Sequence, residues 1–574
     1  MNRLAYIAQR TSFGHGSQMA GKPEQETPRE LCSRVLELLS LYGASDASAA
    51  HLLCDRHDPS NLAYRIVGPD GAAQDLSYRE LSEKSARLAA SLSRRGLGVG
   101  DRIATLMGKS PEYLVALLAI WRLGAVHVPL FTAFGPQAIA LRLNASGCKL
   151  VVCDAAQRPK LRAGPDMPDT ASRLILNIGD AEPGDLTYAA LIQADDGSAP
   201  AAMLGGDAPL IQIYTSGTTG MPKGVVVPVR ALASFQAYAE FGLDLQPYDF
   251  FWNAADPGWG YGLYFGVLAA FTTGVPGMFV RDGFSPEQTY EVLQAFGITN
   301  FTAAPTVYRS LRNADVRVPP GLKLRCASSA GEPLTPEVNE WAKPTLGIEV
   351  HDHYGQTEAG MLINNHHHPA LRRQIKQACM GRPMPGWTAA ILKLDADEPA
   401  APGEVGRLAF DLTASPFAWF GGYVGEPKRT AEKFAGEGRW YVTGDVARAD
   451  AEGDFYFTSR DDDVIIMAGY RIGPFEVETA ILTHSAVAEC AVVAVPDAVR
   501  GEVLEAVVVL RQGQTPSDSL TAEIQIQVKK RYAAHAYPRR VHYAEQLPKT
   551  PSGKVQRYVL RAQLRASQAL RGTA

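Results

Sequence analysis

Hydrophobic and polar positions along the first 150 residues fall into blocks that have helical and strand spacing in turn. The Thr-Pro-Arg-Glu string at 27–30 supplies an N-cap, a first-turn proline and a capping-box glutamate, and predicts a helix to about residue 42. The string at 77–80 repeats the capping box for a helix that ends near Gly96. The pattern then predicts strands over 102–107, 125–130 and 149–154, separated by helices over 111–123 and 136–145. Such alternation indicates a parallel, doubly wound sheet with right-handed crossovers.

The pattern changes further along the chain. Residues 155–208 are polar and rich in Asp and Pro, which predicts a loop excursion, and residues 210–460 return to mixed α/β periodicity. After 459–463 a compact unit follows, with helices from 474 and over 519–532, strands over 488–495, 504–511 and 539–543, and a Lys/Arg-rich tail. We predict an α/β protein with a large multi-subdomain N-terminal body of doubly wound sheets and a small, mobile α+β C-terminal domain. The predicted boundaries are an N-terminal extension over 1–26, the body over 27–461 and a C-terminal lid over 462–574.

Composition narrows the class of protein. Of 574 residues, 46% are hydrophobic and the net charge is −4, which excludes a disordered chain and disfavours a general nucleic-acid binder. The longest apolar run, 113–121, is shorter than the ~20 residues that span a bilayer. Seven scattered cysteines without a C-x-x-C pair predict reduced thiols. Residues 1–23 are basic and lack acids, as in a transit peptide, but we interpret them as an ordinary solvated terminus. We therefore expect a cytoplasmic protein, with the mitochondrial matrix as the alternative in a eukaryote.

A loop rich in Gly and Thr predicts phosphate binding. Apolar, β-prone segments on both sides bracket it, and its glycines allow backbone N–H groups to face an anion. The hydroxyl groups and the lysine add donors and positive charge. The loop is not a Walker A motif, because its lysine lies between Pro222 and Gly224 and a strand follows. The candidate phosphate-binding residues are Thr215, Ser216, Gly217, Thr218, Thr219, Gly220 and Lys223.

Four further strings follow this loop in order: Tyr-Gly-Gln-Thr-Glu at 354–358, Trp-Tyr-Val-Thr-Gly-Asp at 440–445, Gly-Tyr-Arg-Ile-Gly at 469–473 and Leu-Pro-Lys-Thr-Pro-Ser-Gly-Lys at 547–554. Together they resemble the motifs of the adenylate-forming superfamily, which includes acyl-CoA synthetases, firefly luciferase and the adenylation domains of peptide synthetases. The resemblance covers about residues 75–560. It implies that the body binds AMP and that a carboxylate reacts with ATP to give an acyl-adenylate and pyrophosphate. A thiol, CoA, then takes the acyl group and releases AMP, with Mg²⁺ accompanying ATP.

The resemblance also implies roles for individual residues. Lys554 would bridge the acyl carboxylate and the α-phosphate, Thr357 would bond that phosphate, Glu358 would hold Mg²⁺ and Asp445 would accept from the ribose hydroxyls. Asp462 would be the hinge about which the lid rotates between half-reactions. The other nucleotide-binding residues implied are Gly331, Glu332, Pro333, Asp352, His353, Tyr354, Gly355, Gln356, Arg460 and Arg471.

Within the superfamily the chain most resembles medium-chain acyl-CoA synthetases, through strings at 304–309, 470–474, 496–502 and 537–539. This likeness implies a CoA path lined by Ala468, Gly469, Tyr470, Arg500, Tyr537, Pro538 and Arg539. The acyl pocket would be lined by Trp259, Gly260, Tyr261, Ala330, Gly331 and Gly355. Acetyl-CoA synthetases carry tryptophan at the position of Gly355, so glycine predicts a larger pocket for a short- to medium-chain or branched acid.

Several alternatives remain open from sequence. After the acyl-CoA synthetase, the second hypothesis is an acetate- or aryl-acid-CoA ligase or an enzyme that loads a carrier protein. The third hypothesis is a non-catalytic nucleotide-binding protein. A homo-oligomer and acetylation of Lys554, which would remove its charge, are also compatible with the sequence. We interpret the three histidines at 366–368 as a polar loop, because three adjacent imidazoles in regular structure do not all face one metal ion.

Overall fold

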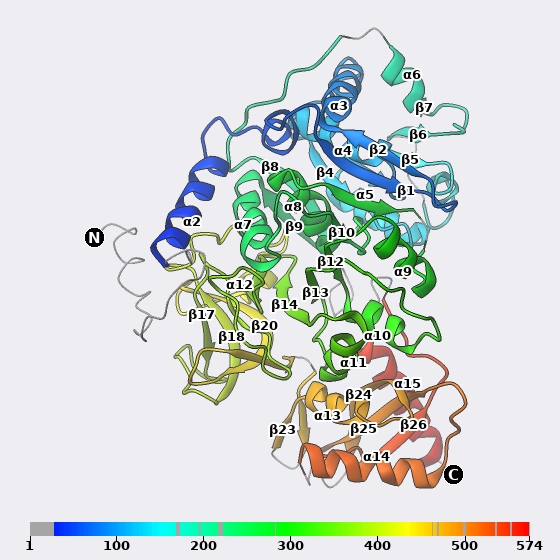
Figure 1. Ribbon diagram of the computed structural model, residues 1–574, viewed down its shortest axis with the longest axis vertical. Coiled ribbons are helices and arrows are strands. Elements are labelled where there is room, and N and C mark those ends of the chain that lie inside the picture. The colour runs from blue at the N-terminus through cyan, green and yellow to red at the C-terminus, as the bar shows by residue number, and fades with distance from the viewer. Residues whose placement is uncertain are drawn as a thin grey trace.

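The computed structural model describes residues 28–167, 173–194, 197–215, 222–281, 283–461, 463–467, 470–497, 501–533, 536–550 and 554–572 (Figure 1). One large sheet of the body has seven strands in the order β7-β6-β5-β3-β4-β8-β9. All neighbours are parallel except β8 and β9, which form an antiparallel hairpin. The strands are β3 (Arg102–Leu106), β4 (Val126–Pro129), β5 (Leu150–Asp154), β6 (Leu174–Ile178), β7 (Leu186–Thr187), β8 (Pro209–Thr215) and β9 (Lys223–Pro228).

A second large sheet has nine strands in the order β16-β15-β14-β13-β12-β10-β11-β1-β2. Its six central strands are parallel, and antiparallel strands complete both edges. The strands are β1 (Leu62–Val67), β2 (Ala73–Ser77), β10 (Phe251–Asn253), β11 (Gly277–Val280), β12 (Asn300–Ala303), β13 (Cys326–Ala330), β14 (Val350–Gln356), β15 (Gly360–Asn364) and β16 (Arg382–Pro383).

Some of the body's helices, such as α4, α5 and α9 to α11, connect parallel strands of one sheet. The helices of the body are α2 (Pro28–Tyr42), α3 (Tyr78–Ser93), α4 (Pro111–Arg122), α5 (Pro136–Ser146), α6 (Tyr188–Gln193), α7 (Leu232–Ala237), α8 (Ala269–Thr273), α9 (Pro286–Ala295), α10 (Pro305–Asn313), α11 (Pro336–Leu346) and α12 (Pro427–Ala431). Short π or 3₁₀ turns are η1 (His51–Asp55), η2 (Arg158–Leu161), η3 (Val229–Ala231), η4 (Tyr238–Gly242) and η5 (Tyr261–Leu268).

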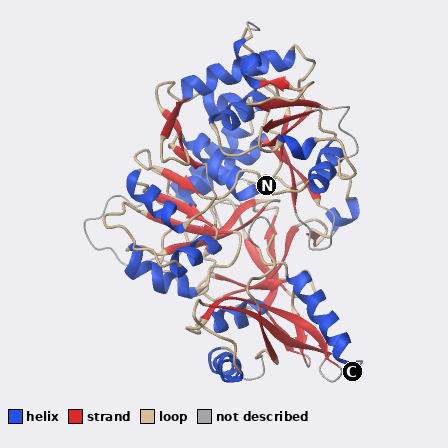
Figure 2. Cartoon of the chain, turned by 90° about the vertical axis from the view of Figure 1, so that its right-hand side faces the viewer, coloured by secondary structure: helices blue, strands red, loops and turns tan. Residues whose placement is uncertain are grey.

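An antiparallel sheet ends the body, and a separate α+β unit follows it. The antiparallel sheet contains β17 (Ala389–Leu392), β18 (Val405–Asp411), β19 (Phe434–Ala435), β20 (Trp440–Ala449) and β21 (Phe455–Arg460). The C-terminal unit contains β22 (Ile465–Met467), β23 (Tyr470–Ile472), β24 (Val487–Asp497), β25 (Gly501–Leu510), β26 (Arg540–Tyr543), α13 (Pro474–Leu482), α14 (Asp518–Arg531) and α15 (Arg557–Gly572). Figure 2 shows its strands and helices as a smaller mass at the C-terminal end of the molecule. Its main buried core uses only residues from Ile465 to Ala536.

Most predicted elements are present within a residue or two of their expected bounds, because their local signals are strong. The Ser77 hydroxyl accepts from the backbone N–H of Glu80, and the Glu80 carboxylate accepts from that of Ser77, so the predicted capping box starts α3. The basic tail, for which we predicted no element, forms α15. The prediction of a loop over 155–208 is partly wrong, since β6 adds to the sheet beside β5 and α6 follows. Such short edge elements are stabilised by pairing with the sheet and leave little periodicity in the sequence.

Two predictions from composition can be compared with the structure. All seven cysteines lie among the described residues as free thiols, and six of them are buried. Within the described part of the chain, no helix has the length and apolar character needed to cross a membrane.

Candidate active site

Strands β13, β14 and β20 bring the predicted nucleotide-binding residues together. β13 and β14 are parallel neighbours, so Gly331, which follows β13, and Thr357, which follows β14, leave the same edge of the sheet. Asp445 lies in β20, directly opposite Arg460 in β21. Side chains from three sheet segments far apart in sequence therefore meet at one edge.

Asp445 is a buried carboxylate held by partners on two strands. Its Oδ2 accepts from the Tyr354 hydroxyl and, at 2.7 Å, from Gln356 Nε2. The hydroxyl of Tyr441 donates to Gln356 Oε1 at 2.8 Å and fixes the orientation of that amide. Arg460 Nη1 lies 3.3 Å from Asp445 Oδ1. Hydrogen bonds from several donors, together with a charged partner, hold such a carboxylate in one position.

Glu358 is a second buried carboxylate, and Tyr423 holds it. The Tyr423 hydroxyl donates to Glu358 Oε1 at 2.8 Å, and burial together with this carboxylate raises the pKa of Tyr423. The Lys223 ammonium lies 4.6 Å from the centroid of the Tyr423 ring, within cation–π range. The backbone carbonyl of the neighbouring Thr357 accepts from Tyr264 at 3.2 Å. The turn that follows β14 is therefore anchored on both sides of Glu358.

Lys554 comes to this site from the C-terminal domain. Its backbone N–H donates to Thr550 Oγ1 at 3.1 Å, which closes the loop that carries it. The side chain reaches solvent, yet crowding by protein atoms lowers the pKa of its ammonium, and Arg460 acts in the same direction. The carboxylates of Glu332, Asp445 and Glu358 act in the opposite direction. The ammonium thus lies within the electrostatic field of the two carboxylates described above.

Glycines lie where the acyl pocket is predicted. A Cβ on Gly331, whose φ is +100°, would lie 3.5 Å from Trp259 Cη2. A Cβ on Gly260 would lie 3.4 Å from Thr357 Oγ1, so both glycines border groups next to the predicted site of reaction. Ala330 and Tyr261 are buried beside them in β13 and η5.

Gly355 does not support the predicted enlargement of this pocket. A Cβ there would lie 2.3 Å from the Gly360 carbonyl oxygen and 2.7 Å from Met361 Sδ. The register of β14 and β15 shifts between Tyr354 and Gly355, and the bulge turns this position into the hairpin. Close approach of β15, and not the acyl group, is the reason that the structure provides for glycine at this position.

The segment predicted to flank adenine is divided between two faces of β14. Burial raises the pKa of Asp352 to about 7, and its carboxyl accepts from the backbone N–H of Leu334 at 3.3 Å. The His353 ring lies on the opposite face, 2.7 Å from the Tyr238 hydroxyl through Nδ1 and 3.1 Å from the Asn365 carbonyl through Nε2. A direct side-chain contact from His353 to a nucleotide is therefore not supported. Glu332 accepts from Arg309 at 2.9 Å, and Pro333 follows it toward α11.

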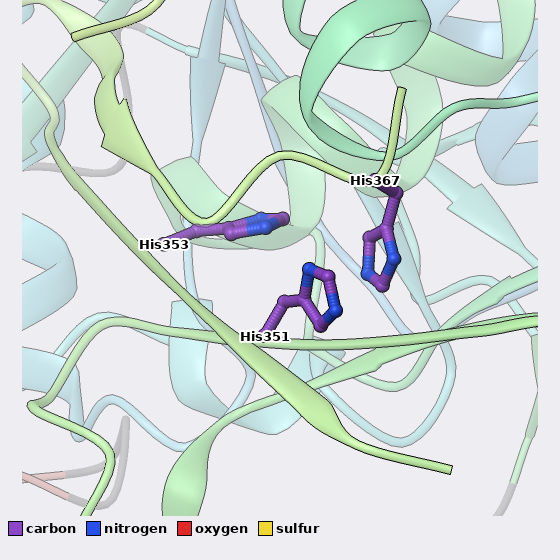
Figure 3. Close-up of side chains that lie close together, drawn as sticks. All are labelled: His351, His353 and His367. Carbon is purple, nitrogen blue, oxygen red and sulfur yellow. The ribbon is translucent and has the colours of Figure 1, made fainter. Parts of the chain in front are cut away.

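The histidines at 366–368 lie in a loop, as we predicted, but two of them are buried. His366 and His367 are buried, and His367 lies against His351 and His353 (Figure 3). The rings of His351 and His367 stack with centroids 3.6 Å apart and an interplanar angle of 13°. Near-parallel rings direct their nitrogen lone pairs side by side instead of toward one point, so the stack is unsuited as it stands to tetrahedral binding of an ion. Burial keeps these imidazoles neutral by lowering their pKa values, to about 4 for His351.

Some predicted residues lie outside the described part of the chain. Those whose placement is not described are Ser216, Gly217, Thr218, Thr219, Gly220, Asp462, Ala468, Gly469 and Arg500, and the same holds for the side chains of Tyr470 and Arg471. Thr215 and Lys223 face each other across the β8–β9 hairpin that carries the phosphate loop. Among the residues predicted for the CoA path, Tyr537 has the guanidinium of Arg539 and the ammonium of Lys529 each 3.9 Å from its ring centroid. The Pro538 carbonyl accepts from Gln525 at 3.0 Å.

Sequence reasoning missed Tyr423, Lys433, Tyr441 and Tyr264, which all contact residues of the site. Lys433 Nζ donates to the Thr443 carbonyl at 2.7 Å, two residues from Asp445. Tyr423, Lys433 and Tyr264 lie outside the recognised strings, whereas Tyr441 lies inside the string at 440–445 but was given no role. The pairing of β19 with β20 brings Lys433 close, and η5 brings Tyr264 close.

Two family models match the chain. The model described as AMP-binding enzyme matches residues 55–414, and the model described as AMP-binding enzyme C-terminal domain matches residues 476–554. Among curated relatives, the acetyl-coenzyme A synthetase of Bacillus subtilis (strain 168) is 35% identical over 90% of this chain and 90% of its own length. The human acyl-coenzyme A synthetase ACSM4, mitochondrial, is 35% identical over 88% of this chain and 87% of its own length.

Solved structures agree with these relatives. The crystal structure of an acyl-CoA synthetase from Brucella canis has 40% sequence identity and a TM-score of 0.71, and the match covers 93% of this chain and 97% of that one. ATP-bound MatB from Rhodopseudomonas palustris has 27% identity and a TM-score of 0.79, with 91% and 99% of the two chains covered. The chain therefore belongs to the AMP-binding enzyme family.

Proposed function

We propose that this protein is an AMP-forming acyl-CoA synthetase that activates a short- to medium-chain or branched carboxylic acid through an acyl-adenylate. The observation that carries the proposal is the convergence of Asp445, Glu358 and Lys554 from two domains on one site. A scaffold that only binds a nucleotide has no need of a lysine presented from a second domain beside two buried carboxylates.

In the first half-reaction a carboxylate oxygen attacks the α-phosphorus of ATP. The new C–O–P bond forms as the bond to pyrophosphate breaks, and the electron pair leaves with pyrophosphate. We propose that Lys554 reduces the repulsion between the two anionic reactants and that Thr357 Oγ1 donates to the α-phosphate. Fixed donors and cations aimed at developing charge are the usual source of such rate enhancement.

Asp445 and Arg460 are our candidates for the ribose, since one carboxylate can accept from both hydroxyl groups. The bond from Tyr354 explains why Asp445 stays in place between turnovers. We propose that the segment 331–333 and Tyr354 border the adenine. Asp352 would hold this segment in place by accepting from the backbone N–H of Leu334, which lies between β13 and α11.

The residues present fit a magnesium ion. The Tyr423 hydroxyl donates to Oε1 of Glu358, whereas Oε2 makes no hydrogen bond within the described part of the chain. A carboxylate oxygen is the ligand type that Mg²⁺ prefers. When bound with ATP, the ion would neutralise phosphate charge, and we propose that Glu358 holds it there while Lys223 faces the phosphate chain.

For the second half-reaction we propose that the domain boundary lies at 461/462 and that the C-terminal domain rotates there about Asp462. Two observations support movement of the domain as one unit: its separate core, and the salt bridge of 2.6 Å between Asp463 and Arg561 in α15. We further propose that Ala468–Tyr470, Arg500 and Tyr537–Arg539 line the CoA path. The guanidinium of Arg539, which lies over the Tyr537 ring, has the planar donor geometry that suits the phosphate groups of CoA.

The substrate range is the least constrained part of the proposal. Trp259 lies next to the Gly331 position, and we propose that its ring forms one wall of the acyl pocket. Since Gly355 faces the hairpin, its lack of a side chain does not argue against acetate. An acetate- or aryl-acid-CoA ligase therefore stays the second candidate.

The test is pyrophosphate release with ATP, Mg²⁺ and CoA across C2 to C10 straight, branched and aromatic acids. We expect a maximum at C4–C8 or branched acids that is lost in Lys554→Ala. A maximum at acetate or benzoate would select the second candidate. Nucleotide binding without pyrophosphate release for any acid, or for a carrier protein as acceptor, would contradict the proposal.

Regulation and location belong to the same proposal. Acetylation of Lys554 would remove the charge on which adenylation depends, and incorporation of acetyl-lysine at this position is expected to abolish ATP–pyrophosphate exchange. We propose a cytoplasmic location, with the mitochondrial matrix as the alternative because several relatives are named mitochondrial. Fractionation of the native cells tests that choice.

A further inference from the structure

Lys433 lies inside the candidate site although no recognised motif contains it. It precedes β19, which pairs antiparallel with β20, and the backbone N–H of Val442 donates to its carbonyl at 2.8 Å. This pairing places its side chain beside Thr443 and Gly444, immediately before Asp445.

The ammonium of Lys433 lies on the same side of β20 as the guanidinium of Arg460, next to Gly444. Its Nζ donates to the Thr443 carbonyl at 2.7 Å. A Cβ built on Gly444 would lie 3.3 Å from this Nζ and 3.9 Å from Arg460 Nη2, so the two cations flank one glycine. The charges of Glu358, Asp445, Arg460 and Lys223 all act on Lys433, so it shares the electrostatic environment of the predicted ribose and magnesium residues.

This cation has no carboxylate partner of its own. In the described part of the chain it forms no salt bridge, and the carbonyl of Thr443 uses one of its three donors. Partial burial, the largest influence, lowers the pKa of its ammonium, and Arg460 and Lys223 lower it further, whereas Glu358 and Asp445 act in the opposite direction without reversing the shift. An unpaired, half-buried ammonium beside two other cations is unfavourable unless an anion completes the site. A neutral donor would be enough to make the hydrogen bond to the Thr443 carbonyl. That bond therefore does not explain why the residue at 433 carries a charge.

We propose that Lys433 is a further catalytic residue of adenylation, which contacts the phosphate chain of ATP and stabilises the negative charge that gathers on departing pyrophosphate. The inference rests on the proposed function. In this step the carboxylate oxygen bonds to the α-phosphorus, the bridging bond to the β-phosphate breaks, and the leaving oxygen takes the electron pair. Lys433 keeps its proton throughout, so its contribution is electrostatic.

The two half-reactions separate this role from a structural one. Pyrophosphate is present only in adenylation, so loss of the Lys433 charge should slow that half-reaction and spare transfer of the acyl group from acyl-AMP to CoA. If Lys433 served only to hold β19 against β20, its loss would displace Asp445 and impair both half-reactions together.

The matched variants are Lys433→Gln, which keeps a donor for the Thr443 carbonyl but loses the charge, and Lys433→Arg, which keeps the charge. Lys428→Met, an exposed lysine of α12, is the control. We expect ATP–pyrophosphate exchange to fall by about 10- to 100-fold in Lys433→Gln, to recover in part in Lys433→Arg, and to stay at the wild-type rate in Lys428→Met.

A binding measurement makes the test independent of turnover. Calorimetry with the magnesium complex of α,β-methylene-ATP should show about tenfold weaker binding to Lys433→Gln, at an unchanged melting temperature. The rate at which acyl-AMP reacts with CoA should change by less than about twofold in Lys433→Gln.

Equal losses in both half-reactions, or wild-type binding and exchange in Lys433→Gln, would overturn the proposal. Absence of exchange in the wild type would refute the proposed function, while the analogue would still report on Lys433.

Discussion

The body and the C-terminal domain hold their site residues in different ways. In the body, Asp445 and Glu358 are buried, and each is bonded to a tyrosine from another strand or loop. In the C-terminal domain, Lys554 lies on a loop that is closed by Thr550, with its side chain open to solvent. The body therefore holds its two carboxylates in fixed positions, whereas in the described part of the chain the Lys554 side chain makes no hydrogen bond that its movement would break.

The Lys554 loop is nonetheless firmly connected within its own domain. α15 begins three residues after Lys554, and Arg557 in its first turn pairs with Glu478 of α13 at 2.7 Å. Arg561 pairs with Asp463, next to the predicted hinge, at 2.6 Å. These pairs tie the residues on both sides of the Lys554 loop to the rest of their domain, as the proposed rotation about Asp462 requires.

The largest expected effect is that of Lys554→Ala. We expect ATP–pyrophosphate exchange to fall by about 100- to 1,000-fold, because a cation at the developing charge is lost. The melting temperature should stay near that of wild type, since the side chain is exposed. Transfer from acyl-AMP to CoA should be nearly unaffected. Lys549→Ala on the same loop, which loses a surface pair with Glu489 at 2.7 Å, is the control and should change exchange little.

Tyr423→Phe tests the fixed side of the comparison. Removing the hydroxyl leaves Glu358 Oε1 without its donor, and we expect the Mg²⁺ concentration for half-maximal pyrophosphate release to rise about tenfold. The measurement is a Mg²⁺ titration at fixed, saturating ATP. An unchanged Mg²⁺ requirement would show that Tyr423 does not position Glu358 for the ion.

The buried histidines of the body predict a pH-dependent stability. Burial lowers the pKa values of His351 and His366 to about 4, below the ordinary value near 6.5. A depressed pKa contributes stability above pH 6.5 that is lost as the pH falls toward 4, by up to about 1.4 kcal/mol per pH unit for each ring. Asp352, with a pKa raised to about 7, acts oppositely, since its contribution is lost as the pH rises toward 7.

Urea unfolding of the body at pH 7, 6 and 5 measures this dependence. We expect the free energy of unfolding to fall from pH 7 to 5, because the buried imidazoles outnumber Asp352. His351→Gln should reduce the slope although it weakens the stack with His367. A variant slope equal to that of wild type would show that His351 does not titrate on unfolding.

The smallest expected effect concerns the contact between the two domains. Arg511 Nη1 donates to Asn313 Oδ1 of α10 at 3.1 Å, at an exposed position. Asn313→Ala should change the ratio of the two half-reaction rates by less than about threefold, since exposed polar contacts contribute little. The readout is ATP–pyrophosphate exchange against acyl-AMP thioesterification in the same preparation. A larger change would mean that this contact selects the orientation of the domain.

Sequence reasoning succeeded where a signal is local. The capping box at Ser77 and Glu80 needs only three neighbouring residues, and α3 begins there. The strings around Asp445 and Lys554 identified the family, and the matches to both family models confirm it. The roles of the individual residues stay predictions, as do those of the loop residues 216–220, whose placement is not described.

Sequence reasoning failed where residues distant in the chain determine the surroundings of a side chain. Gly355 was interpreted from its chemistry alone, but a bulge in β14 turns it against Gly360. Three adjacent histidines suggested solvent, yet His367 is buried against His351, because β14 and the segment after β15 lie side by side. A linear pattern contains neither bulges nor partners across strands.

By itself, the sequence determined the family, the alternation of helices and strands, and the residue types available for handling a nucleotide, because these depend on short-range propensities and contiguous motifs. The tertiary structure alone decided which side chains support those motifs. Tyr423 reaches Glu358 from 65 residues away, and β19 brings Lys433 to Thr443. The physical reason is that hydrogen bonds and charges act over a few ångströms, and only folding brings such distant residues within that range.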